Sequence, residues 1–180
     1  MMTSMLSALA MLPALAGAEA DDDPRETRDD FSLAVGPLLR TDRGTYAILQ
    51  SGLAAEAEAP IAWRFNLRLD FMTGHTTRDD LRVSGPKLAA MAVYHQPIDI
   101  FAVDIGVGPG AWFGPSAWWN KSYPGPWPGW RAAVGGSYRP HPWVGARIDF
   151  GVDQHFGTYP LVNGSSTGWD LRLMLVGWVP

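Results

Sequence analysis

Strict alternation of apolar and polar residues distinguishes the segment from Trp63 to Phe71. Every odd position in it carries a large apolar side chain, and every even position carries a charged residue or an amide. Because successive side chains of a β-strand point to opposite faces, the segment predicts a strand with one apolar and one polar face. Aromatic residues stand at both ends of the apolar face, roughly 20 Å apart along the membrane normal if the strand crosses a bilayer with a tilt.

Other segments have the length and the flanking turn residues of strands. The segment from Trp130 to Tyr138 repeats the aromatic spacing, and apolar residues alternate again from Trp169 to Val179. The segment 45–58 is rich in alanine and also fits a helix, and Gly85-Pro86 predicts a bulge. We predict strands at residues 31–40, 45–58, 61–72, 81–94, 98–107, 130–138, 144–156 and 169–179.

The connections between the predicted strands alternate in length. Short connections lie immediately before the predicted strands that begin at residues 61, 98 and 144. The longer connections span residues 73–80, 108–129 and 157–168. Small outer-membrane barrels alternate short periplasmic turns with longer outer loops in this way. An even number of strands with a periplasmic N-terminus would place every longer connection outside the cell.

Composition narrows the class of protein. The chain has 180 residues, of which 47% are hydrophobic, and a chain of this kind forms one folded domain rather than a disordered segment. No apolar run long enough for a transmembrane helix follows the N-terminal segment. The net charge of −4 provides no basic surface for nucleic acid, and the absence of cysteine excludes disulfides and thiolate metal sites.

The N-terminal segment has the features of an export signal. A short apolar core from Met5 to Ala16 precedes the small residues of Ala16-Gly17-Ala18 and Ala18-Glu19-Ala20. The segment before the core lacks lysine and arginine, and an ordinary N-terminal helix is the alternative. We predict a cleaved signal peptide at residues 1–20, an acidic disordered leader at 21–30 and a barrel domain at 31–180.

From Phe31 to Val179 the chain resembles the small eight-stranded outer-membrane β-barrels of the OmpA/OmpX-type class. The signal segment, the strand count, the loop alternation and the aromatic spacing carry the resemblance, which includes no diagnostic motif. It implies an all-β fold, an eight-stranded antiparallel up-and-down transmembrane β-barrel in the cell outer membrane. One departure is the end of the chain, Gly177-Trp178-Val179-Pro180, because the class usually ends on an aromatic residue.

The polar faces of the predicted strands carry charges of both signs. An eight-stranded barrel is only wide enough for side chains to fill its interior, so charges there must be paired. We therefore predict a network that plugs the lumen, with Glu56 and Glu58 near its periplasmic end, and a narrow ion or solute path as the alternative. The predicted network comprises Arg64, Asn66, Arg68, Asp70, Asp104, Arg131, Arg139, Arg147, Asp149, Asp153, Asp170 and Arg172.

Aromatic residues form two further predicted sets. One set is a girdle that faces outer-membrane lipid and lipopolysaccharide, unless these residues belong to an ordinary core. It comprises Trp63, Phe71, Tyr94, Phe101, Trp130, Tyr138, Trp143 and Trp169. The other set lies in the proline-rich loop 108–129 and could bind an extracellular glycan or protein, fold over the barrel mouth or extend the girdle. It comprises Trp112, Phe113, Trp118, Trp119, Tyr123 and Trp127.

A weak catalytic hypothesis rests on residues at the ends of the last two strands. Asp153, His155, Ser165 and Ser166 have the chemistry of an acid, a base and a nucleophile. The small barrels that deacylate lipid A would show His-x-Ser here, but this chain has His155-Phe156-Gly157. The remaining histidines fall in predicted connections, lack metal-ligand spacing and should be solvated, and we predict no metal and no cofactor.

Three functions follow from these patterns. The favoured one is a non-enzymatic outer-membrane barrel with a plugged lumen, which acts in envelope structure or surface interaction. The alternatives are an outer-membrane enzyme that modifies lipids and a soluble periplasmic barrel that holds an apolar ligand, as lipocalins do. The soluble alternative requires the apolar face of the strands to point inward. The orientation of the Trp63–Phe71 strand therefore discriminates between the soluble barrel and the two membrane barrels.

Overall fold

The structure is a computed structural model that describes residues 30–43, 47–78, 81–113, 116–118, 121–123, 126–156 and 165–179. The predicted signal peptide at 1–20 and residues 21–29 of the predicted leader lie outside the described residues. Within the described part of the chain, no helix has the length and apolar character needed to cross a membrane.

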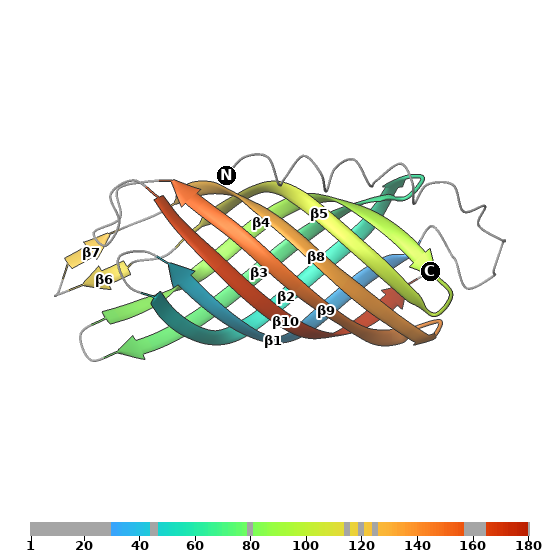
Figure 1. Ribbon diagram of the computed structural model, residues 1–180, viewed down its shortest axis with the longest axis horizontal. Helices are drawn as coiled ribbons and strands as arrows, with labels where there is room; N and C mark the ends of the chain where they lie inside the picture. Colours follow the sequence, from blue (N-terminus) through green and yellow to red (C-terminus); the bar gives the residue numbers. More distant parts are fainter. Residues whose placement is uncertain are drawn as a thin grey trace.

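Eight long antiparallel strands close into a barrel, and two short strands are attached to it (Figure 1). Each long strand pairs with its neighbour in the chain, and the pairing of β1 with β10 completes the circle. The eight-stranded up-and-down barrel predicted from the sequence is therefore confirmed. The long strands are β1 (Phe31–Arg43), β2 (Ala47–Ala62), β3 (Phe65–Arg78), β4 (Leu81–Ile98), β5 (Phe101–Trp112), β8 (Trp127–His141), β9 (Val144–Phe156) and β10 (Ser165–Val179).

The strands are staggered around the barrel, as closure requires. The register of the strand pairs, followed from Leu33 on β1 once around the barrel, leads back to β1 at Arg43. This displacement makes the strands cross the barrel axis obliquely, which is visible in Figure 1. Eight strands enclose an interior that side chains can fill completely.

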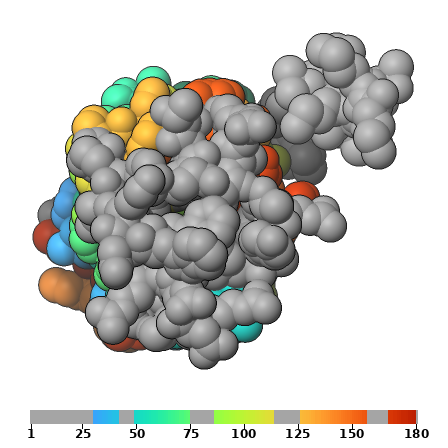
Figure 2. Space-filling model, turned by 90° about the vertical axis from the view of Figure 1, so that its left-hand side faces the viewer, coloured from blue at the N-terminus to red at the C-terminus, as the bar shows by residue number. Residues whose placement is uncertain are grey.

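The two ends of the barrel differ. At one end, which we call the inner end, β1 begins, β10 ends, and short turns at residues 63–64, 99–100 and 142–143 join the strands. We call the opposite end the outer end. At the outer end the β3–β4 hairpin projects with the short hairpin of β6 (Ser116–Trp118) and β7 (Lys121–Tyr123), which pairs with the start of β4. Figure 2 is a space-filling view onto this end, and residues near the start of the barrel (blue and cyan) and near its end (orange and red) are visible around its rim.

Two predicted outer loops are mostly strand. Only residues 79–80 separate β3 from β4, so the prediction of a loop over 73–80 was wrong. Strands also occupy much of the segment 108–129, because β5 continues to Trp112 and β8 starts at Trp127. The β-branched residues Thr73, Thr76 and Thr77 favour the extended backbone, which the hydrophobic pattern alone did not reveal.

The turn between β2 and β3 lies four residues later than predicted, at residues 63–64 rather than 59–60. Trp63 and Arg64 form this turn, and Ile61 belongs to β2 rather than to the start of β3. Trp63 adopts a positive φ of 29°, an uncommon conformation for a bulky residue. The predicted bulge at Gly85-Pro86 is absent from the pairing of β3 with β4, whose register is continuous.

Large apolar side chains cover the outside of the barrel. On β3, Phe65 and Phe71 are exposed, whereas Arg68 and Asp70 are only about 1% exposed. The same inversion holds on β10, where Leu173 is 58% exposed and Arg172 is fully buried. The two alternatives that required the apolar face to point inward, an ordinary core and a lipocalin-like pocket, were therefore wrong.

Glycines on the lumen-facing sides of β8 and β9 leave space for charged side chains. A Cβ atom on Gly135 would lie 1.6 Å from Oδ1 of Asp149, and one on Gly151 would lie 2.1 Å from Nη2 of Arg131. Both distances are far below van der Waals contact, so no larger residue fits without displacing the charged group.

We predict that Gly151→Ala lowers the free energy of unfolding by about 1–3 kcal/mol, because the added methyl group overpacks the site. The guanidinium of Arg131 cannot yield, since Asp70 and Asp170 hold it in a fully buried position. Gly177→Ala is the control, because the nearest atom to its Cβ would be 3.9 Å away. Urea unfolding in detergent micelles measures the free energy of unfolding of both variants. Equal stability of the two variants would contradict the close packing at Gly151.

Candidate functional site

The charged side chains inside the barrel form one connected network. Among the described residues, six cationic and seven acidic side chains are buried. They divide into three groups along the barrel. The inner cluster is Arg68, Arg147, Glu56, Glu58, Asp104 and Asp149. The middle cluster is Arg131, Arg172, Asp70 and Asp170. The outer cluster is Arg40, Lys87 and Asp153.

Arg68 on β3 is the centre of the inner cluster. Its Nε donates to Glu58 at 2.7 Å, its Nη2 to Asp104 at 3.1 Å and its Nη1 to Asp149 at 3.2 Å. These three carboxylates come from β2, β5 and β9, so one guanidinium joins opposite walls of the barrel. Arg147 on β9 binds Glu56 at 2.9 Å and Glu58 at 3.0 Å.

Two arginines and two aspartates form the middle cluster. Arg131 donates to Asp170 through Nη1 at 2.6 Å and Nη2 at 2.9 Å, and to Asp70 through Nε at 3.0 Å. Arg172 binds the same two carboxylates at 2.8 and 2.9 Å and also donates to Glu56 of the inner cluster. Bidentate contacts of this kind are among the stronger hydrogen bonds in proteins.

The outer cluster is built on Asp153 of β9. Arg40 donates to both of its oxygens, at 2.6 and 2.7 Å. Nζ of Lys87 lies 3.6 Å from Asp153 and 5.5 Å from the ring centre of Trp112, a cation–π geometry. Cationic charge therefore exceeds acidic charge here, the reverse of the inner cluster.

This arrangement follows from the strand pattern. One face of each strand meets the apolar surroundings, so its charged residues all fall on the other face and must share a narrow interior. Desolvated charges persist only when they are paired and hydrogen-bonded, and the network provides those partners. Small apolar clusters, including Leu38, Met72 and Met174 at one wall and Met91 at another, fill much of the remaining interior.

Most of the predicted lumen residues lie in this network, but three lie at its margin. Asn66 is half-buried and donates to Glu58. Arg64 was predicted to lie in the lumen network, but it lies in the β2–β3 turn, where it hydrogen-bonds to Gln96. Arg139 lies at the inner rim, where it pairs with Asp30 and stacks 4.7 Å from the ring centre of Trp178.

Three further residues of the interior were missed. Arg40 extends the inward face of β1 two residues beyond Leu38, so strand parity alone identifies it. Lys87 also faces inward, a position that the wrongly predicted bulge at Gly85-Pro86 obscured. His95 was predicted to be solvated in a connection, but it lies on β4 and its Nδ1 is 2.6 Å from Oδ1 of Asp104.

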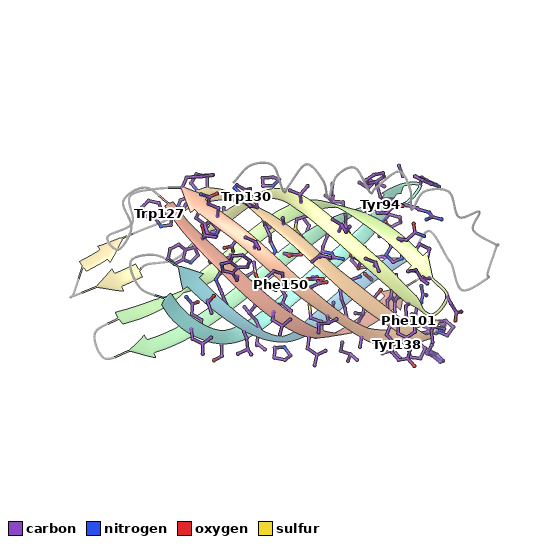
Figure 3. The ribbon with its side chains drawn as sticks, in the orientation of Figure 1. Tyr94, Phe101, Trp127, Trp130, Tyr138 and Phe150 are labelled. Carbon is purple, nitrogen blue, oxygen red and sulfur yellow. The ribbon has the colours of Figure 1, made fainter. Side chains whose placement is uncertain are left out.

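The structure places all eight predicted girdle residues on the outside of the barrel. Tyr94, Phe101 and Tyr138 lie towards the inner end, and Trp130 lies at the outer end (Figure 3). The rings of Phe101 and Tyr138 stack with centroids 5.1 Å apart. Nε1 of Trp130 donates to Gln154 at 3.1 Å, which satisfies its polar group next to an apolar surface. The others are Trp63, Phe71, Trp143 and Trp169.

The six aromatic residues predicted to lie in the outer loop do not share one environment. Trp112 was wrongly assigned to this loop, because this residue ends β5 inside the barrel and is only 2% exposed. Phe113 is exposed directly after β5, and Trp127 is half-buried at the start of β8. Trp119 lies outside the described residues, as do the side chains of Trp118 on β6 and Tyr123 on β7.

The weak catalytic candidates are not arranged as a catalytic group in the described side chains. Both oxygens of Asp153 accept hydrogen bonds from Arg40, and Nε2 of His155 lies 3.4 Å from one of them inside the lumen. The backbones of Ser166 and His155 pair across β10 and β9, but the side chains of Ser165 and Ser166 lie outside the described residues. The described residues contain no cluster that could hold a metal ion.

Comparison with solved structures identifies the class to which this fold belongs. Neisserial surface protein A (NspA) superposes with a TM-score of 0.71 at 10% identity, covering 82% of this chain and 96% of NspA. OprG of Pseudomonas aeruginosa gives 0.59 at 10% identity, covering 84% of this chain and 96% of OprG. Ail, the attachment invasion locus protein of Yersinia pestis, gives 0.57 at 9% identity, covering 83% and 97%.

The chain therefore has the fold of the small eight-stranded outer-membrane β-barrels, as the sequence pattern predicted. At these identities the likeness concerns the fold alone. No protein-family model matches the chain, and no curated protein matches it in sequence.

We predict that Arg131→Met lowers the free energy of unfolding by about 3–5 kcal/mol, because it leaves Asp70 and Asp170 without their main buried partner. Arg139→Met, on the same strand, should reduce stability by no more than about 1 kcal/mol, since its side chain is partly exposed at the rim. Urea unfolding followed by tryptophan fluorescence measures both. Equal losses for the two variants would show that the buried network does not stabilise the barrel.

Proposed function

We propose that this chain is an integral outer-membrane protein whose lumen is blocked by its own side chains and whose role is structural or in surface interaction. The observation that carries the proposal is the inversion of the barrel, with bulky apolar residues outside and paired charges inside. A water-soluble barrel would lose stability by exposing such a surface, whereas a bilayer accommodates it.

The aromatic residues support a transmembrane orientation. Tyr94, Phe101 and Tyr138 towards one end and Trp130 at the other bracket an aliphatic belt, as the girdles of outer-membrane barrels do. The inner end, with its short turns and the ends of β1 and β10, would face the periplasm. The cleaved signal peptide at residues 1–20 remains a prediction that fits export to this compartment.

The ion-pair network supports a closed lumen. Arg68, Arg131 and Arg172 each donate at least three hydrogen bonds to carboxylates, and each reaches carboxylates on at least two other strands. An ion that passed through would have to break these contacts in a desolvated interior. We therefore propose that the barrel does not conduct.

The outer end supports a role at the cell surface. Strands β3 and β4 and the β6–β7 hairpin project there. Phe113, whose backbone N–H donates to the carbonyl oxygen of Pro86 on β4, exposes its ring. NspA is named as a surface protein and Ail as an attachment invasion locus protein. We propose that this end contacts lipopolysaccharide, a glycan or a protein.

The lipid-modifying enzyme has less support. Asp153 and His155 point into the lumen, away from the outer surface along which acyl chains would lie. Arg40 already occupies both oxygens of Asp153. A His155→Gln variant that changed the lipid A profile of the host would contradict the non-enzymatic role.

The proposal is tested first by fractionation and conductance. We expect the protein to be extracted from cell envelopes only by detergent, to migrate differently on gels before and after heating, and to produce no stepwise current in planar bilayers. Release by osmotic shock alone would overturn the membrane assignment, and reproducible current steps would overturn the closed lumen.

The loss of stability caused by a charged substitution on the lipid-facing surface should depend on the depth of the residue in the bilayer. Leu173→Arg, near the middle of β10, should lower stability in lipid vesicles by about 2–4 kcal/mol, because the charge meets hydrocarbon. Ile98→Arg, at the inner turn, should cost no more than about 1 kcal/mol. The two side chains are 58% and 56% exposed, so they are a matched pair. Equal effects of both substitutions on refolding stability would argue against a bilayer around the barrel.

A further inference from the structure

One arginine at the inner end differs from the others in its partners. Arg64 is half-buried in the β2–β3 turn, and it forms no ion pair with any carboxylate of the described residues, including the exposed Asp99 of the next inner turn. Every other arginine whose side chain the structure describes forms such a pair; these are Arg40, Arg68, Arg131, Arg139, Arg147 and Arg172. Arg64 is therefore a cation that the described part of the protein does not neutralise.

The guanidinium of Arg64 lies against the lipid-facing side of β4. It donates to Oε1 of Gln96, which pairs across the sheet with Val103, and directly opposite residues of an antiparallel pair share one face. Val103 is exposed on the outside of the barrel, whereas His95, one residue before Gln96, points into the lumen. Gln96 and the guanidinium that binds it are therefore on the outside of the barrel.

Three contacts fix Arg64 in this position. Its partner Gln96 is only 9% exposed, and Oε1 of this amide accepts a second hydrogen bond from the hydroxyl of Tyr94 at 2.9 Å. The guanidinium carbon of Arg64 lies 5.4 Å from the ring centre of Trp63, a cation–π contact. The carbonyl oxygen of Arg64 accepts the backbone N–H of His95 at 2.8 Å, which ties the turn to β4. Because the side chain is already ordered, a ligand that binds it causes a smaller loss of entropy.

The level of Arg64 in the barrel matches the headgroup region of a bilayer. It directly precedes Phe65, whose ring contacts that of Tyr94 with centroids 5.6 Å apart, and Tyr94 belongs to the aromatic girdle towards the inner end (Figure 3). Aromatic girdles of membrane proteins lie at the boundary between hydrocarbon and headgroups. A cationic side chain one residue beyond the girdle therefore reaches the layer of the lipid phosphates.

We propose that Arg64, held by Gln96 and Trp63, binds the phosphate of an anionic phospholipid in the leaflet at the inner end of the barrel. This inference rests on the proposed function, because it requires a bilayer around the barrel. A guanidinium has five N–H donors, of which Gln96 takes one, and the others suit two phosphate oxygens at once. A cation without a carboxylate partner attracts a lipid with a net negative charge more strongly than a zwitterionic lipid.

Arg139 provides a matched control at the same end of the barrel. Its guanidinium also stacks on an indole, 4.7 Å from the ring centre of Trp178, but it is paired with Asp30. Loss of either arginine removes one positive charge from the inner end, so a nonspecific attraction of lipid by net charge would weaken equally in both variants. Only the loss of Arg64 should remove a phosphate site.

The test measures lipid binding by the whole folded protein. The protein in a zwitterionic detergent is titrated with phosphatidylglycerol or phosphatidylcholine, and native mass spectrometry counts the bound lipids. We expect one phosphatidylglycerol to bind about tenfold more tightly than phosphatidylcholine, and Arg64→Gln should weaken its binding about tenfold. Arg139→Gln should leave this binding unchanged, and inorganic phosphate at the same concentration should not displace the lipid.

Three results would overturn the lipid site: equal weakening by Arg64→Gln and Arg139→Gln, equal binding of the two lipids, or displacement by inorganic phosphate. None of them affects the membrane assignment, because heat-modifiable migration and insertion into vesicles report on that assignment separately. Failure of the natural protein to insert into vesicles would overturn the proposed function and the lipid site together.

The variant Gln96→Leu tests how Arg64 is held. The substitution suits a lipid-facing surface, but it removes the acceptor that Arg64 and Tyr94 share. We expect phosphatidylglycerol to bind about threefold more weakly, with heat-modifiable migration unchanged, because the guanidinium is no longer ordered in advance. Val103→Leu, opposite Gln96 on β5, is the control and should bind the lipid as the natural protein does. Undiminished binding by the Gln96→Leu variant would contradict the role of this amide in holding the guanidinium.

Discussion

The width of an eight-stranded barrel is the constraint on which the rest of this structure depends. The interior holds side chains and little else, so every charged residue on an inward face must find its partner on another strand. Three arginines satisfy this requirement by reaching across the barrel, and glycines such as Gly135 and Gly151 leave the space that the charged groups occupy. Closure, register and charge pairing are thus one interdependent arrangement rather than three separate features.

The same constraint decides what the outer surface can be. With the charges inside, the outward positions are free to be uniformly apolar, and aromatic side chains mark the two ends of the belt. The inner end is short and closed by turns, whereas the outer end carries the strands that project beyond the barrel. The proposed division of labour follows: the belt holds the protein in lipid, the lumen stabilises it, and the outer end meets other molecules.

The fold could be predicted from the sequence because alternation and turn spacing are local signals. They located the barrel and most of the lumen, including Arg68, Arg131 and Arg172, from strand parity alone. Strand ends were less predictable, since the hydrophobic pattern stops at the apolar belt while the backbone continues as strand beyond it, as at Thr76 and Trp112. Lys87 and His95 were missed for related reasons: an assumed bulge hid the first, and a strand end drawn too early hid the second. Which carboxylate meets which arginine depends on register between distant strands, which no local pattern specifies.

The central claim is that the apolar face of the strands faces lipid and the charged face fills the lumen. The chain contains no cysteine, so single cysteines can be introduced on β3 at positions 65 to 71 and labelled with an environment-sensitive fluorophore. After refolding in vesicles that contain a lipid-borne quencher, labels at Phe65, Leu67, Leu69 and Phe71 should be quenched, and labels at Asn66, Arg68 and Asp70 should not. Quenching at the even positions instead, or equally at both sets, would contradict the account.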